Sequence, residues 1–153
     1  MNLSLVSITP HATSEKRSKP SDILVSLYLG RIPEIFAKVN SLAFRTPDLL
    51  WERLEKQSSR SRPLFVLLDS RGKRLTSEQF ADWLGKQRDQ GQQSIVFAIG
   101  PADGWSEEAR KRAHLLLSLG PMTLPHELAR VVLSEQIYRA FTILSGHPYH
   151  TGH

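Results

Sequence analysis

The sequence predicts an α/β fold in which helices cover both faces of a parallel sheet. Short apolar runs alternate with amphipathic helical patterns along the whole chain, as strands and crossover helices do in such folds. Two runs, residues 64–69 (LFVLLD) and 94–100 (SIVFAIG), are apolar almost throughout, which is typical of strands buried on both faces. The chain has 153 residues and 40% hydrophobic content, enough for one core. We therefore expect one domain spanning residues 1–153.

The N-terminal part is expected to supply two strands and two helices. Residues 3–8 form an apolar segment that ends at a Thr-Pro pair and predict a first strand, and the polar, basic residues 11–19 predict a loop. Apolar residues recur at helical spacing in 23–32, after a Ser-Asp pair that can cap a helix. Residues 36–44 have a strand-like but ambiguous pattern. A Thr-Pro-Asp sequence opens a helix at residues 46–54.

The middle of the chain repeats this alternation. Residues 70–74 (SRGKR) follow the first buried strand and predict a basic turn. An amphipathic helix is expected from Thr76, and a second one is expected where Ser106 precedes two acids that suit the first turn of a helix.

The C-terminal part combines a buried segment with the longest helix. Residues 115–125 are apolar and interrupted by Gly120-Pro121, and Pro125 opens a helical pattern that continues to Gly146.

Composition limits the classes of function. The chain has no cysteine, which excludes disulfides and thiolate metal sites. A formal charge of +5 suits an anionic partner such as nucleic acid, although such an excess also serves solubility alone. The sequence has neither a recognisable signal peptide nor an apolar stretch long enough to span a bilayer, so we expect a soluble, cytoplasmic protein that binds no membrane.

Three predicted strand ends form the candidate ligand site: Leu68-Asp69, residues 99–101 and residues 119–124. In open α/β sheets, ligands bind outside the carboxyl ends of the strands. These segments offer backbone groups and apolar side chains rather than acids, bases or nucleophiles, so they suit a ligand held by main-chain hydrogen bonds. Each Gly-Pro pair taken alone is more simply a turn. Neither a dinucleotide-binding glycine motif nor a P-loop nor a nucleophile elbow is present.

The C-terminal sequence SGHPYHTGH holds half of the six histidines in its last seven residues. Three interpretations are open: an inert tail, an ordered wall of a pocket, or a metal site. From the residues alone the inert tail ranks first because chain ends usually fray, the pocket second, and the metal third because no carboxylate motif accompanies the histidines.

Two stretches carry a resemblance to a known family. FAIGPADGWS and SLGPMTLPHELARVVLSEQIYRAFTILSGHPYH closely resemble the ribosomal RNA large subunit methyltransferase H family, bacterial pseudouridine-N3 methyltransferases of the SPOUT superfamily. The resemblance covers residues 64–150, and the first strand and Tyr28, Leu29, Arg31 and Pro33 look like its N-terminal part. It implies the SPOUT-type α/β fold with a deep C-terminal trefoil knot.

The resemblance also implies a reaction and its participants. The activity is methylation of N3 of a pseudouridine in 23S ribosomal RNA on the ribosome, with S-adenosylmethionine as donor and no metal. The family is a homodimer in which the partner completes each cofactor pocket. The family's cofactor positions fall on Leu68, Gly100, Leu119, Gly120, Pro121, Met122, Thr123 and Leu124.

Within the last helix and the tail, the resemblance selects three catalytic candidates. Tyr149 is expected to position the base, His150 to handle a proton or support charge, and Arg139 to contact substrate or phosphate unless it only pairs with Glu135 one turn earlier. We expect His126 to satisfy the first turn of the last helix. Met122 has an alternative role as ordinary core filler.

Two departures from the family pattern leave alternatives open. Pro101 replaces a glycine and removes a backbone donor, and Thr151 replaces a basic residue. The alternatives are a non-catalytic RNA- or ribosome-binding module of the same fold and a SPOUT methyltransferase that acts on transfer RNA. A metal hydrolase that uses the histidines ranks last.

Overall fold

A parallel five-stranded sheet forms the centre of the computed structural model, which describes residues 1–10, 19–57 and 62–152. The strand order is β2-β1-β4-β3-β5, with every neighbouring pair parallel. The strands are β1 (Asn2–Ile8), β2 (Lys38–Phe44), β3 (Leu64–Arg74), β4 (Ser94–Ile99) and β5 (Leu115–Ser118). The predicted α/β class and each predicted strand are confirmed, and the ambiguous 36–44 segment is a strand from Lys38. The loop expected at 11–19 lies almost wholly outside the described residues.

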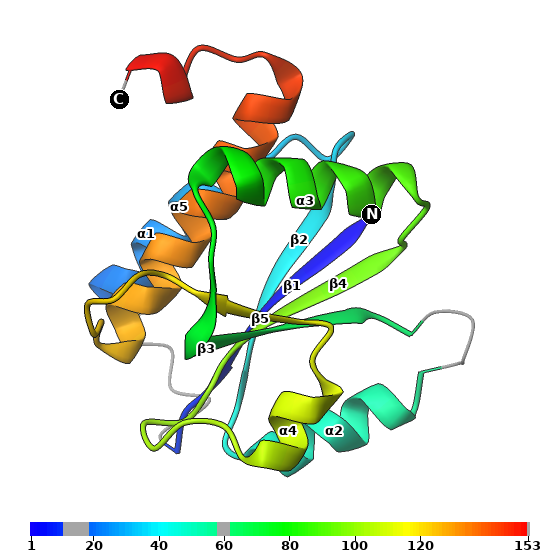
Figure 1. The fold of residues 1–153 in the computed structure, drawn as a ribbon, viewed down its shortest axis with the longest axis vertical. Helices are drawn as coiled ribbons and strands as arrows, with labels where there is room; N and C mark the ends of the chain where they lie inside the picture. Colours follow the sequence, from blue (N-terminus) through cyan, green and yellow to red (C-terminus); the bar gives the residue numbers. More distant parts are fainter. Residues whose placement is uncertain (11–18, 58–61, 153) are drawn as a thin grey trace.

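Helices cover both faces of this sheet (Figure 1). They are α1 (Pro20–Gly30), α2 (Pro47–Glu55), α3 (Ser77–Asp89), α4 (Glu107–Arg112) and α5 (His126–Ser145), followed by a short 3-10 turn, η2 (His150–Gly152). In Figure 1, α1, α3 and α5 lie on one side of the sheet and α2 and α4 on the other. The caps expected at Thr46 and Ser106 are confirmed, since each hydroxyl accepts a hydrogen bond from the backbone N–H three residues later.

Alternate residues of the central strands face the two helical layers. Leu5 and Phe97 belong to the buried cluster with α1, α3 and α5, whereas Val6 and Ala98 belong to the cluster beneath α2 and α4. A strand's side chains alternate between faces, so an unbroken apolar run supplies both cores at once.

The prediction of a basic turn directly after residue 69 is wrong in one respect, because β3 continues to Arg74. Residues 69–72 bulge out of the strand, and Lys73 and Arg74 then pair again with β5, at Leu117 and Ser118. Gly72 permits this return: a Cβ there would lie 2.5 Å from the backbone carbonyl of Leu116. The two strands therefore approach more closely than any side chain at Gly72 allows.

Among the described helices, none is long and apolar enough to cross a membrane.

Candidate active site

A cavity of about 620 Å³ opens beside the bulge of β3 and at the carboxyl ends of β4 and β5, where the sequence places the three candidate strand ends. All eight residues expected to contact a cofactor line it, together with further residues of the same three loops and the start of α5. The eight are Leu68, Gly100, Leu119, Gly120, Pro121, Met122, Thr123 and Leu124. The structure therefore brings together what the sequence predicted as one site, and the volume is that of a pocket for a small molecule.

Trp105 holds two of these loops together from within the cavity wall. Its indole N–H donates a hydrogen bond to the backbone carbonyl of Leu68 at 3.1 Å, and the side chain is buried. A Cβ on Gly100 would lie 2.8 Å from this indole. Gly100 is thus required by the close approach of Trp105, a residue that sequence reasoning missed although it directly follows the Gly-Pro turn.

The loop after β5 presents its backbone to the cavity. Gly120 has φ of 127°, a conformation that favours glycine, and its N–H donates to the Ser118 hydroxyl at 3.2 Å. Met122 is 82% exposed, so the alternative role of Met122 as core filler is wrong.

Asp69 is a nearly buried carboxylate in the cavity wall. Arg71 and Arg110 approach its two oxygens at 3.3 and 3.2 Å. Burial alone would raise the pKa of Asp69, but hydrogen bonds from the backbone and side chain of Arg71, together with both arginine charges, hold the pKa below its usual value. The cavity wall therefore contains one ionised carboxylate, whose negative charge Arg71 and Arg110 balance.

His126 begins α5 and lines the cavity, but the expectation that it satisfies the first helical turn is wrong. Pro125 is the N-cap residue, and no side chain caps the helix. Nδ1 of His126 lies 3.8 Å from Glu127, and Nε2 is buried without a hydrogen-bond partner among the described residues. Burial lowers the pKa of His126, and Arg130 and Lys19 lower it further against the opposing effect of Glu127. The lowered pKa favours the neutral imidazole.

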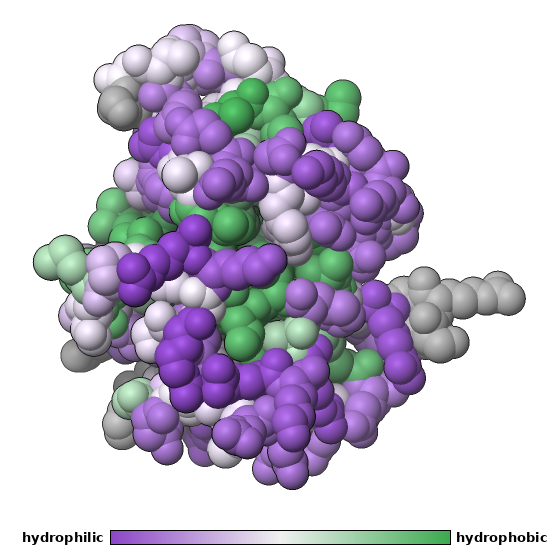
Figure 2. Space-filling view, viewed as in Figure 1, coloured by the Kyte–Doolittle hydropathy of each residue, from purple (hydrophilic) through white to green (hydrophobic). Residues whose placement is uncertain are grey.

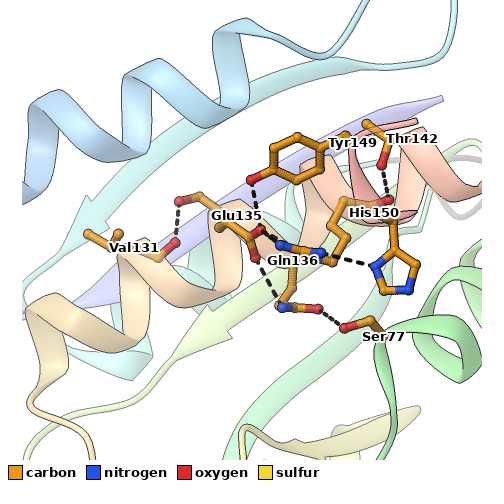
Figure 3. Close-up of polar contacts among 9 residues, drawn as sticks. Ser77, Val131, Glu135, Gln136, Thr142, Tyr149 and His150 are labelled. Atoms are coloured by element: carbon orange, nitrogen blue, oxygen red, sulfur yellow. Dashed lines mark hydrogen bonds and ion pairs between the residues drawn. The ribbon is translucent and has the colours of Figure 1, made fainter. Parts of the chain in front are cut away.

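At the far end of α5, a hydrogen-bonded network holds Tyr149 and His150, so the fraying on which the inert-tail interpretation depended is wrong for this part of the tail. Tyr149 donates to a Glu135 oxygen at 3.0 Å, and Arg139 donates to the same oxygen through Nε at 2.9 Å and Nη2 at 2.6 Å (Figure 3). Gln136 links the other Glu135 oxygen to Ser77 at the start of α3. The predicted alternative pairing of Arg139 with Glu135 is confirmed.

The network also determines the proton on His150. Nδ1 lies 3.0 Å from Arg139 Nη1, which can only donate, so Nδ1 accepts. Nε2 then carries the proton and donates to Glu78 of α3 at 2.8 Å. Both ring nitrogens are engaged, which ties the tail to two helices.

Tyr149 is a donor here rather than a base. Burial raises the pKa of its hydroxyl, and the hydrogen bond to the charged Glu135 raises it further. Its ring lies 4.9 Å from the Arg139 guanidinium. Tyr149, His150 and Arg139, the three candidates that the resemblance selects, therefore form one cluster.

The structure does not bring this cluster to the cavity of the same chain. None of the three lines the cavity, whereas His126 does, and the helix from His126 to Arg139 extends roughly 20 Å at about 1.5 Å per residue. The cofactor positions and the catalytic candidates thus occupy opposite ends of α5.

A second cavity of about 300 Å³, which the sequence did not predict, lies beside β5 between α3 and α5. Phe80, Leu117 and Leu133 are apolar lining residues, and Arg74 and Gln136 are polar ones. Figure 2 shows the molecule from the same side as Figure 1, and hydrophobic residues lie in the middle of this face with hydrophilic ones around them.

Within residues 1–10, 19–57 and 62–152, no group of three or more His, Asp or Glu side chains is placed to hold a metal ion.

A parallel sheet with a small-molecule cavity at its carboxyl ends defines a ligand-binding α/β protein. A family model described as "Predicted SPOUT methyltransferase" matches residues 8–150. The chain belongs to this SPOUT methyltransferase family.

Curated relatives agree over most of the chain. The chain is similar to a protein named Ribosomal RNA large subunit methyltransferase H from Allorhizobium ampelinum, with 41% identity over 152 residues that cover 91% of this chain and 95% of the relative. A protein of the same name from Koribacter versatilis is 58% identical over 101 residues, 66% of this chain and 69% of that one.

A solved structure supports the fold. The SpoU methyltransferase AviRb from Streptomyces viridochromogenes, determined in complex with the cofactor AdoMet, matches with a TM-score of 0.51 and 12% identity. The match covers 95% of this chain but only 61% of that chain, and at this identity it shows the fold alone.

Proposed function

We propose that residues 1–153 form a single S-adenosylmethionine-dependent methyltransferase domain that acts on N3 of a pseudouridine in 23S ribosomal RNA. The observation that carries the proposal is the cavity that all eight expected cofactor residues line together. The names of the relatives, ribosomal RNA large subunit methyltransferase H, support the substrate.

The cavity suits S-adenosylmethionine. Backbone from the loops at Leu68, Gly100 and Leu119–Leu124 would hold the adenosine and methionine parts, and Trp105 and the leucines provide apolar contact. Pro101 removes one possible donor but keeps its carbonyl, which accepts from Gly104 at 2.8 Å. When bound, the cofactor supplies an electrophilic methyl group on a sulfonium.

The tail would prepare the nucleophile. N3 of pseudouridine must lose its proton, and its lone pair must point at the methyl group, so the protein has to orient the base and stabilise negative charge. We assign base positioning to Tyr149, substrate or phosphate contact to Arg139, and charge support or proton handling to His150. Glu135 is a positioning residue, because its carboxylate fixes Tyr149 and Arg139 together.

The separation along α5 supports a homodimeric enzyme in which the tail of one subunit faces the cavity of the other. A single chain holds its own tail at the end of α5 remote from its cavity. An uncovered apolar face on α1 and α5 supports the same assembly, since large exposed apolar side chains mark interaction surfaces. Its exposed members are Ile23, Leu24, Leu27 and Leu128.

We also propose the deep trefoil knot for the C-terminal part. Its support is the path of α5, which follows the edge strand β5 yet packs between α1 and α3 against the central strands β1 and β4 (Figure 1).

The test is direct. Ribosomes from a strain in which the corresponding gene is deleted should lack one methyl group on a pseudouridine of the large-subunit RNA, and the purified protein with S-adenosylmethionine should restore it, as mass spectrometry would show. Cofactor binding without transfer to ribosomes or transfer RNA would favour the non-catalytic module. Transfer only to transfer RNA would favour the other SPOUT activity.

A further inference from the structure

Five side chains from α1, α5 and the tail form a continuous series of aromatic rings and cations. The Arg31 guanidinium lies 5.8 Å from the Tyr28 ring and 5.9 Å from the Tyr138 ring. Tyr138 in turn lies 4.8 Å from Tyr149, whose ring lies 4.9 Å from Arg139. The series therefore begins and ends with an arginine and contains the tyrosine expected to position the base.

The two arginines differ in their electrostatic state. Glu135 neutralises Arg139 through two hydrogen bonds to one oxygen, and Arg139 also contacts His150. Arg31 is exposed, and within the described part of the chain no carboxylate lies within ion-pairing distance of it. The series thus carries an uncompensated positive charge at the α1 end only.

Arg31 is also pre-organised. It follows α1 as the C-cap residue, where its backbone N–H bonds to Tyr28 and Leu29, and two tyrosine rings restrict its side chain. An arginine held in this way loses little conformational entropy when it binds a planar anion, and its fork of donors matches the oxygens of a phosphate.

We propose that Arg31 binds a backbone phosphate of the ribosomal RNA next to the nucleotide that Tyr149 positions. The inference rests on the proposed function and adds a substrate-contacting residue from outside the tail. A cation at the C-terminal end of a helix also interacts favourably with the helix dipole. That role requires no contact with aromatic rings, and it predicts that RNA binding does not depend on the charge of Arg31.

The experiment uses the full-length protein and large ribosomal subunits from the deletion strain. Arg31→Ala should raise KM for these subunits about tenfold, the effect of losing one charged hydrogen-bonded contact, and change kcat by less than about twofold. The slope of log affinity against log salt should decrease in magnitude by about 0.7 to 0.9, as expected for one lost phosphate contact. Arg31→Lys should keep the slope while raising KM less, because the charge remains.

Arg53→Ala is the matched control, since Arg53 is an exposed arginine in the last turn of α2, on the opposite face of the sheet. Affinity for S-adenosylmethionine and the oligomeric state of Arg31→Ala should equal those of the wild type. An Arg31→Ala variant that matches Arg53→Ala overturns the inference. The inference is also overturned if Arg31→Ala loses affinity for S-adenosylmethionine, or no longer forms the wild-type oligomer, while the slope of log affinity against log salt is unchanged. If the wild type transfers no methyl group at all, the proposed function fails. The salt dependence of its affinity for the large ribosomal subunit then still decides the role of Arg31.

Discussion

The two ends of α5 are built by different means. At the N-terminal end, the cavity is made of backbone segments and close contacts that only glycine permits, with Trp105 bonded to the Leu68 carbonyl. At the C-terminal end, one carboxylate, Glu135, organises Tyr149 and Arg139 by side-chain hydrogen bonds. The cavity end is suited to a ligand of constant shape, and the tail end to a charged substrate. Substitutions at the two ends should therefore impair different steps.

The largest expected effect is a restoration of activity from two inactive variants. Gly100→Val places branched carbons against the Trp105 indole and should abolish cofactor binding, while Tyr149→Ala should remove base positioning and lower kcat at least about a hundredfold. If each site combines the cavity of one subunit with the tail of the other, mixed dimers contain one intact site. A one-to-one mixture should then recover about one quarter of the wild-type rate, measured as methyl transfer to ribosomes.

The control combines both substitutions in one chain. Mixed dimers of the double variant with the wild type contain no intact site if tails act in the partner, and one intact site if each chain is self-contained. Two results together would contradict the proposed assembly. The mixed dimer of the double variant with the wild type would keep half of the activity, and the mixture of the two single variants would recover none.

Stability should respond strongly at the bulge that shapes the cavity. Gly72→Ala forces a Cβ against the backbone of Leu116 and Leu117 at 2.5 to 2.7 Å, and two paired strands cannot separate without losing hydrogen bonds. We expect a loss of about 3 kcal/mol in the free energy of unfolding and a fall of roughly 10 °C in Tm, by calorimetry. Gly30→Ala, where a Cβ meets nothing within 4 Å, should change stability by less than about 1 kcal/mol. Equal effects of the two changes would refute this role of Gly72.

These contrasts explain which parts the sequence could predict. Apolar runs and caps depend on neighbouring residues, so the strands, the helix starts at Thr46 and Ser106, and the three segments that line the cavity were predictable. The continuation of β3 was not, because the pairing of Lys73 with Leu117 is a contact between distant segments. The residues alone did not predict the order of the tail for the same reason: its contacts include Glu78, which lies on another helix.

The cavity end should also sense pH through His126. Burial holds the pKa of this imidazole below 6.5 in the folded protein, so the unfolded chain binds the proton more readily. The contribution of His126 to the free energy of unfolding should therefore be fully present above about pH 6.5. It should decrease as the pH falls from 6.5 through the lowered pKa. His126→Gln should flatten this part of the curve, measured by denaturant unfolding at several pH values. An unchanged slope in the variant would exclude His126 as its source.

The smallest expected effect concerns the attachment of the tail to α3. The hydrogen bond from His150 lowers the pKa of Glu78 below 4.5, so this contact contributes above pH 4.5 and is lost as the pH falls through the lowered pKa. At neutral pH, Glu78→Gln should accelerate hydrogen exchange of the amides in residues 147–152 by roughly two- to fivefold, as for the loss of one exposed side-chain contact, while exchange in β4 stays unchanged. Because Glu135 holds Tyr149 independently, the tail should remain docked and cofactor affinity should not change. Complete release of the tail by this substitution would mean that the Glu78 contact, rather than Glu135, anchors it.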